Sequence, residues 1–200
     1  MKACVVDSGT GNLRSLGNAL ALLEVPFEVR TEPPGPAADV LVLPGVGSFG
    51  HAMGRLDASG WAPFLRGWAR DGGAIVGICL GLQLLFGASE ESPGVRGLGL
   101  LAGEVRRLSG RKAKVPHMGW ARLEGAAEGS PEFRLAWAYF VHSYAASPAD
   151  PSIVSAWARH GEIFPAAVRK GPLAGVQFHP EKSQREGVCF LGALLAEVAP

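Results

Sequence analysis

The chain has 200 residues, of which 48% are hydrophobic, and its 19 basic and 18 acidic side chains leave a formal net charge of +1. This length and composition are typical of a single globular domain, over residues 1–200, with a large buried core. The balanced charge gives no general electrostatic reason to bind nucleic acid, and the longest apolar runs are too short to span a membrane.

The first part of the chain alternates apolar strands with helices. Strands are expected at residues 2–6, 27–30, 40–43 and 74–78, and helices at 13–23 and 63–71. The first helix has leucines at a 3.6-residue period and Asn12 as its N-cap, and residues 32–36 form a stiff, proline-rich connector. Strands that alternate with helices in this way indicate right-handed βαβ units and a parallel sheet.

After Gly87 the pattern changes to short strands separated by Gly, Pro and Ser. These strands centre on Val105, Trp120, Tyr139, Val154, Val168 and Val176, and an apolar helix over 187–198 closes the chain. Such strands are typical of a mixed or antiparallel extension of a sheet. The predicted fold is therefore α/β, with three layers around a flavodoxin-like, mostly parallel sheet and a mixed or antiparallel extension.

The most distinctive segment is Gly77-Ile78-Cys79-Leu80-Gly81, which lies between an apolar strand and a helical pattern. Glycines two residues before and after the cysteine allow close backbone approach, as in a strained strand-to-helix turn that exposes a nucleophile. A helix N-terminus there favours the thiolate. The alternative is an ordinary core cysteine, which is our interpretation of Cys4 and Cys189. Three widely separated cysteines without a secretory signal indicate a reducing cytoplasm.

The segment His179-Pro180-Glu181 offers this thiol a base and a carboxylate. Pro180 favours an extended backbone at His179, and on a strand the side chains of His179 and Glu181 project to the same side. Glu181 could then orient the imidazole in a nucleophile–base–acid triad. The alternative is a strand-end histidine beside a surface glutamate. Metal binding is less favoured, because no third ligand has a recognisable spacing.

The glycine-rich segment Pro44-Gly45-Val46-Gly47 follows a buried strand. It is either a simple turn or an oxyanion hole, in which backbone N–H groups stabilise a developing negative charge. Ligands of parallel sheets bind at the carboxyl ends of the strands, where Cys79 is also expected. The oxyanion hole is therefore the interpretation that connects the two segments.

The cysteine turn and the later Phe178-His179-Pro180-Glu181 resemble the class I, triad-type glutamine amidotransferases. Within that family, four segments resemble the glutaminase subunits of imidazole glycerol phosphate synthases, and the likeness covers essentially the whole chain. These segments are residues 7–15, 116–120, 139–144 and 177–183. Two departures are Ala121, where the family usually has Asn, and Leu82, where Met is commoner.

The resemblance implies the class I glutamine amidotransferase fold and a role for each motif. Cys79 attacks the side-chain amide of glutamine to give a glutamyl thioester and ammonia, His179 moves protons, and Glu181 orients His179. The oxyanion positions are Gly45, Val46, Gly47 and Leu80. The positions that hold glutamine are Gln83, His142, Ser143 and Tyr144. The positions at a partner contact are Asn12, Trp120, Tyr139 and Lys182. No metal or organic cofactor is implied.

The partner implied by the resemblance is a (β/α)₈ cyclase subunit, with which the chain forms a heterodimer. Ammonia passes through that barrel to a phosphorylated ribulosyl intermediate, and the products are imidazole glycerol phosphate and AICAR in histidine biosynthesis. One alternative is the glutaminase subunit of another synthase, such as pyridoxal phosphate synthase. Another is a non-catalytic domain of the same architecture that uses Cys79 as a sensor thiol.

Overall fold

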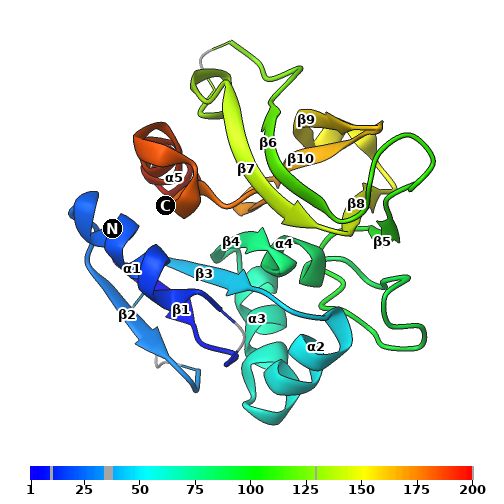
Figure 1. Ribbon diagram of the computed structural model, residues 1–200. Coiled ribbons are helices and arrows are strands. Elements are labelled where there is room, and N and C mark those ends of the chain that lie inside the picture. Colours follow the sequence, from blue (N-terminus) through cyan, green and yellow to red (C-terminus); the bar gives the residue numbers. More distant parts are fainter. Residues whose placement is uncertain (10, 34–37, 129, 200) are drawn as a thin grey trace.

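The computed structural model describes residues 1–9, 11–33, 38–128 and 130–199 (Figure 1). Residues 34–36 of the expected proline-rich connector lie outside this description. A seven-stranded sheet has the order β2-β1-β3-β4-β11-β10-β9. Its parallel strands are β1 (Ala3–Val6), β2 (Phe27–Arg30), β3 (Val40–Gly45), β4 (Ala74–Cys79) and β11 (Leu173–Val176). Its antiparallel strands are β9 (Val154–His160) and β10 (Glu162–Lys170).

Helices cover both faces of the sheet. On one face lie α1 (Leu13–Leu22) and α5 (Gln184–Val198), and on the other α2 (Phe49–Ala58), α3 (Trp61–Arg70) and α4 (Leu80–Leu84). Side chains alternate along each strand, so Val5 packs in the core beneath α1 and α5 while Cys4 packs in the core beneath α2 and α3. The three-layer α/β prediction is confirmed, and the order of the five parallel strands is the flavodoxin-like one.

Two antiparallel ribbons extend this framework. One pairs β5 (Gly103–Arg107) with β8 (Tyr144–Pro148), and the other pairs β6 (His117–Arg122) with β7 (Trp137–His142). We call the second pair the β6–β7 ribbon. Its inner face buries Phe140 and Ala121, while Trp120 and Trp137 on its outer face are 44% and 55% exposed. Three short 3₁₀ helices are η1 (Glu132–Arg134), η2 (Pro151–Ile153) and η3 (Pro180–Lys182).

Each expected strand is present, but some element boundaries and two elements differ from the prediction. The helix α2 and the strand β8 were not expected, α3 begins at Trp61, and α5 begins at Gln184. The interpretation of Cys189 as a core residue is wrong: it is exposed, because α5 buries only the side that carries Phe190 and Leu194. Among the described residues, no helix is both long and apolar enough to cross a membrane.

Candidate active site

The turn around Cys79 has the strained geometry that its glycines indicate. Cys79 ends β4 with a positive φ of 55°, and it is 6% exposed. A Cβ on Gly77 would lie 2.6 Å from the backbone nitrogen of Leu82, and one on Gly81 would lie 1.7 Å from the carbonyl oxygen of Leu43. Both glycines are therefore required by close backbone approach, as predicted. The helix that follows has only five residues, so its dipole is small.

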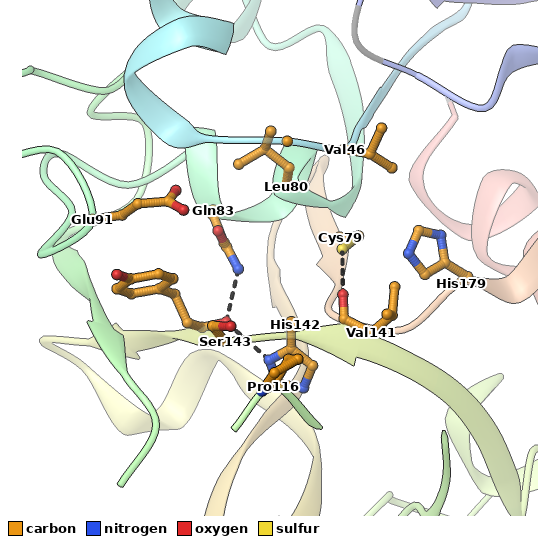
Figure 2. A pocket seen from close by; sticks show the side chains of 12 residues that line it. Val46, Cys79, Leu80, Gln83, Glu91, Pro116, Val141, His142, Ser143 and His179 are labelled. Carbon is orange, nitrogen blue, oxygen red and sulfur yellow. Dashed lines mark hydrogen bonds between the residues drawn. The ribbon is translucent and has the colours of Figure 1, made fainter. Parts of the chain in front are cut away.

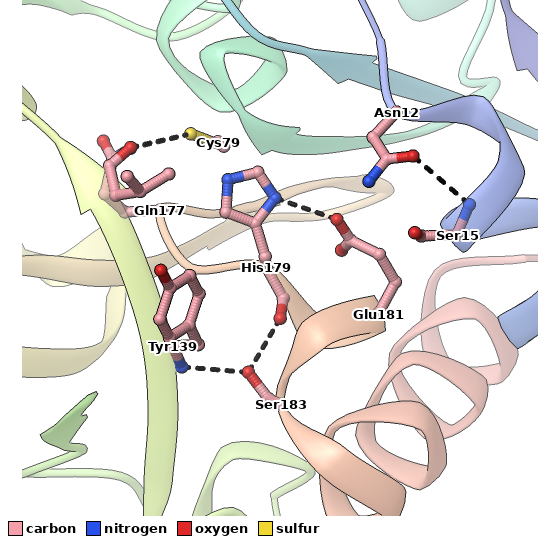
Figure 3. A network of polar contacts seen from close by, with 9 residues as sticks. Asn12, Ser15, Cys79, Tyr139, Gln177, His179, Glu181 and Ser183 are labelled. Carbon is pink, nitrogen blue, oxygen red and sulfur yellow. Dashed lines mark hydrogen bonds and ion pairs between the residues drawn. The ribbon is translucent and has the colours of Figure 1, made fainter. Parts of the chain in front are cut away.

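Cys79, His179 and Glu181 lie together at the carboxyl end of the parallel strands (Figure 3). The Nδ1 atom of His179 lies 2.9 Å from Oε1 of Glu181, and the two side chains are 3% and 4% exposed. The opposite edge of the ring faces the Cys79 sulfur. His179 has the extended backbone expected before a proline, with φ −102° and ψ 95°. The strand geometry expected at Glu181 is wrong, because Pro180 begins the 3₁₀ helix η3. That single turn nevertheless brings Glu181 back to His179.

The surroundings of His179 favour its protonated form. Burial alone lowers the pKa of an imidazole, because the charged form loses its hydration. Here the contacts with Cys79 and Glu181 outweigh burial and raise the pKa of His179 to about 9. A protonated His179 between a thiolate and a carboxylate is the arrangement that an activated cysteine nucleophile needs.

The glycine-rich segment lies directly beside the cysteine turn. Gly45 pairs with Cys79 across the β3–β4 ladder, and a Cβ on Gly45 would lie 3.1 Å from the Cβ of Leu80. Gly47 has a positive φ of 97°, a backbone conformation open to glycine and strained for most other residues. Val46, Gly47 and Leu80 all line a cavity that also contains Cys79.

This cavity, of about 260 Å³, brings together the positions expected to hold a substrate. Its wall includes Cys79 and His179 on one side (Figure 2). The expected substrate-holding residues are all present in the wall: Gln83, His142, Ser143 and Tyr144. The structure therefore places predicted residues from α4, β7 and β8 at one site.

One acidic side chain of the cavity was missed. Glu91 lines the cavity, and its Oε2 accepts a hydrogen bond of 2.7 Å from the backbone nitrogen of Phe49, at the start of α2. A carboxylate at a helix N-terminus stabilises the helix and is itself held in place. No motif surrounds Glu91 in the sequence, so no local signal identified it.

A chain of amide hydrogen bonds fixes the orientation of Gln83. Its Nε2 donates to the carbonyl oxygen of Tyr144 at 2.8 Å and to Oε1 of Gln177 at 3.0 Å. Both amide hydrogens of Gln83 are therefore used, and its Oε1 remains as an acceptor. Gln177 is fully buried, and its Nε2 contacts the sulfur of Cys79 at 3.7 Å. Gln177 was also missed, although it lies two residues before His179.

The expected partner-contact residues border the triad and the outer face of the β6–β7 ribbon. Asn12 caps α1 through Ser15 and borders a small cavity beside Glu181. The rings of Trp120 and Tyr139 lie 5.9 Å apart, edge to face, and Lys182 is exposed in η3. In contrast, Ala121 is buried on the inner face of the ribbon.

Hydrogen bonds connect the backbone of Tyr139 to residues 179–183, which we call the triad loop. The backbone nitrogen of His179 donates to the carbonyl oxygen of Tyr139 at 2.9 Å. The backbone nitrogen of Tyr139 donates to the hydroxyl of Ser183 at 3.0 Å, and that hydroxyl donates to the carbonyl oxygen of His179 (Figure 3). Within the described parts of the chain, no group of three His, Cys, Asp or Glu side chains could hold a metal ion.

Comparisons with known proteins show what the whole chain is similar to. Residues 4–191 match the family model described as glutamine amidotransferase class-I. The chain is 45% identical to the imidazole glycerol phosphate synthase subunit HisH of Moorella thermoacetica, over 92% of this chain and 89% of that protein. It is 43% identical to the subunit of the same name from Bacillus subtilis, over 94% and 92%.

Among solved structures, one described as a glutamine amidotransferase superposes with a TM-score of 0.76 at 22% identity, covering 96% of this chain and 98% of the other. A second, described as PurLQS from Thermotoga maritima, has a TM-score of 0.75 at 21% identity, covering 98% and 97%. At these identities the two structures show the shared fold alone.

Proposed function

The chain belongs to the class I glutamine amidotransferases, and from this premise we propose that it hydrolyses glutamine and supplies the ammonia to a synthase partner. The observation that supports this most directly is the position of the cysteine nucleophile. Cys79, paired with His179 and Glu181, opens into a cavity of amino-acid size, about 260 Å³. A sensor thiol would need neither the buried carboxylate nor this cavity.

In the proposed mechanism, the thiolate of Cys79 attacks the side-chain carbonyl carbon of glutamine, and the carbonyl oxygen becomes negatively charged. Backbone N–H groups of the Gly45–Gly47 segment and of Leu80 stabilise that oxygen. Protonated His179 donates its proton to the leaving nitrogen, and ammonia departs from a glutamyl thioester. His179, now neutral, then takes a proton from water, which attacks the thioester and releases glutamate.

The cavity offers acceptors for the amino group of glutamine. The free Oε1 of Gln83 and the carboxylate of Glu91 both belong to its wall. An α-ammonium group has three donors and a positive charge, so two oxygen acceptors, one of them a carboxylate, are complementary to it. In this assignment Gln83 and Glu91 recognise the amino-acid end, and Cys79 meets the amide end.

The proposed partner is a (β/α)₈ cyclase subunit, because relatives of more than 40% identity are named as subunits of imidazole glycerol phosphate synthase. We assign the contact to the outer face of the β6–β7 ribbon with Asn12 and Lys182. Trp120 and Trp137 are exposed there, and exposed aromatic side chains are enriched at protein interfaces. The complex would make imidazole glycerol phosphate and AICAR in the cytoplasm, in histidine biosynthesis.

The test uses the complex with the cyclase subunit and two cysteine variants. Cys79→Ala should abolish glutamine-dependent synthesis and leave ammonium-dependent synthesis intact, because the partner receives ammonia from either source. Cys189→Ala, at an exposed cysteine on α5, is the matched control and should keep both activities. If Cys79→Ala loses both activities, the residue is structural or the partner is wrong.

A second measurement separates the enzyme from the sensor domain. A glutamine-analogue affinity reagent should modify Cys79, and added glutamine should protect it. Labelling that glutamine does not change would favour a sensor thiol. A partner identified by co-purification as another synthase would favour the alternative of a different glutaminase subunit.

A further inference from the structure

Three histidines lie together at the substrate cavity: His142 lines it, His117 contacts His142, and His160 stacks on His117. His117 is 3% exposed and His142 is 7% exposed, and both belong to the inner face of the β6–β7 ribbon. Their rings meet through Nδ1 of His117 and Nε2 of His142, 3.2 Å apart. The ring of His160 stacks on His117 at a centroid distance of 4.1 Å. The triad chemistry described above uses none of these rings directly.

The hydrogen-bond partners determine which nitrogen of each ring carries hydrogen. Nδ1 of His142 lies 2.9 Å from the carbonyl oxygen of Tyr144, which can only accept, so this nitrogen is protonated. In a neutral ring Nε2 is then an acceptor, and it must receive its hydrogen bond from Nδ1–H of His117. The two bonds therefore run in one direction, from His117 through His142 to Tyr144.

Both rings lie in surroundings that keep them neutral. Burial, with a smaller contribution from His160, lowers the pKa of His117 to about 4. Burial lowers the pKa of His142 to about 3, against the opposing hydrogen bond to Tyr144. A neutral pair preserves the direction of the bonds, because a second proton on His142 would remove the acceptor that His117 needs.

The carbonyl oxygen of Tyr144 connects this pair to Gln83, the side chain proposed to bind the substrate. It accepts from Nδ1 of His142 and also from Nε2 of Gln83, and the two bonds converge on it in Figure 2. Because Nε2 of Gln83 is held there and at Gln177, Oε1 is the atom of Gln83 that is left to accept from a ligand. The position of one carbonyl oxygen thus decides which end of the Gln83 amide is presented.

We infer that His117 and His142 are positioning residues that hold the Tyr144 carbonyl and, through it, the glutamine-binding orientation of Gln83. The inference rests on the proposed function, since the orientation of Gln83 matters for catalysis only if glutamine is the substrate. His142 acts here through a backbone carbonyl, and His117 acts through His142. Removing either bond should therefore weaken substrate binding more than it slows the chemical step.

Nitrogen-15 NMR of the full chain at pH 7 tests the hydrogen bonds independently of any activity. We expect both His117 and His142 to be neutral with hydrogen on Nδ1. The commoner form of a free neutral histidine, with hydrogen on Nε2, at either residue would overturn the inference, as would a charged ring. Because the measurement uses the unaltered chain, it does not depend on the folding of a variant.

Kinetics of the complex with the cyclase subunit test the consequence for binding. In His142→Phe the ring volume remains but the donor to Tyr144 is lost, and we expect KM for glutamine to rise about tenfold with kcat within about twofold. His142→Asn restores a donor near the position of Nδ1 and should bring KM back to within about threefold of the wild type. His117→Phe should have a smaller effect in the same direction.

The control is His160→Phe, which keeps a ring against His117 and leaves the two bonds of the pair in place, while removing the bond from His160 to the Lys114 carbonyl. It should leave KM and kcat unchanged. A KM for His142→Phe equal to that of the wild type, or a KM for His142→Asn as high as that of His142→Phe, would overturn the inference. If the wild-type complex has no glutaminase activity, the proposed function fails, and the NMR result still decides whether the pair exists.

Discussion

The closest backbone approach of the cysteine turn predicts a large difference between two glycine-to-alanine substitutions. A Cβ on Gly81 would lie 1.7 Å from the carbonyl oxygen of Leu43, whereas real Cβ contacts stay beyond 3.0 Å. Strand β3 and the turn would have to separate by roughly the difference, about 1.3 Å, within a packed interior that resists such shifts. Gly54, in the exposed face of α2, has nothing within 4 Å of its would-be Cβ.

Gly81→Ala should therefore lower the free energy of unfolding by at least ~3 kcal/mol, at the upper end for overpacked cores. The melting temperature of a chain of this size would fall by about 6–12 °C. Gly54→Ala adds the same atom inside a helix and should instead stabilise the chain by ~0.5–1 kcal/mol, because alanine is the better helix former.

Urea unfolding of both variants, followed by circular dichroism, measures the two changes. The variants are matched in the atom added, so a general effect of an extra methyl group would move both in the same direction. Equal unfolding midpoints for Gly81→Ala and the wild type would refute the steric reasoning. It would mean that the turn can open without cost, and that its glycines are not required by packing.

Three further predictions concern the triad and the partner. Because the pKa of His179 is raised from 6.5 to about 9, its contribution to stability is full below about pH 6.5 and is lost as the pH rises through 9. Glu181→Gln removes one cause of that shift, so its free energy of unfolding should fall less between pH 6 and pH 9.5 than that of the wild type. An equal fall in the variant and the wild type would contradict this. The isolated chain should have weak glutaminase activity, since the oxyanion segment is expected to need its partner; full activity without the cyclase would contradict this. Trp120→Ala should weaken cyclase binding by ~2 kcal/mol or more in calorimetry, whereas Ile163→Ala, 51% exposed on β10, should not.

The centre of the sheet was predictable because β1, β3 and β4 are continuous apolar runs. The helix α2 was not, because its sequence contains Gly50 and Gly54 and its N-cap Ser48 makes no side-chain cap. Its N-terminus is instead capped by Glu91 and Ser92, 42 residues later in the chain. That stabilisation comes from tertiary structure and has no local signal.

The strand β8 has a similar explanation. It is short, it ends in Pro148, and its pairing partner β5 lies some 40 residues earlier. The pattern around residue 144 therefore gave no strand signal of its own.

The residues of the candidate site also divide into those that the sequence identified and those that it did not. Cys79 was identified by the glycines two residues before and after it, and His179 and Glu181 were identified by their two-residue separation. Both patterns constrain the local geometry of the backbone. Glu91 and Gln177 were not identified, because their importance depends on which atoms the fold brings near them. The local geometry expected for Glu181 was wrong although its contact with His179 was right, since a 3₁₀ turn and a strand can both bring side chains two residues apart together.

The bonds between Tyr139 and the triad loop have a mechanical consequence. Cys79 is fixed in the parallel sheet by the β3–β4 ladder, whereas the backbone amide of His179 is bonded to a surface strand. The backbones of the nucleophile and its base are thus held by different strands, so a displacement of the β6–β7 ribbon would change the distance between the sulfur of Cys79 and the imidazole of His179. We therefore expect a partner bound to Trp120 and Tyr139 to alter that distance without contacting the substrate cavity.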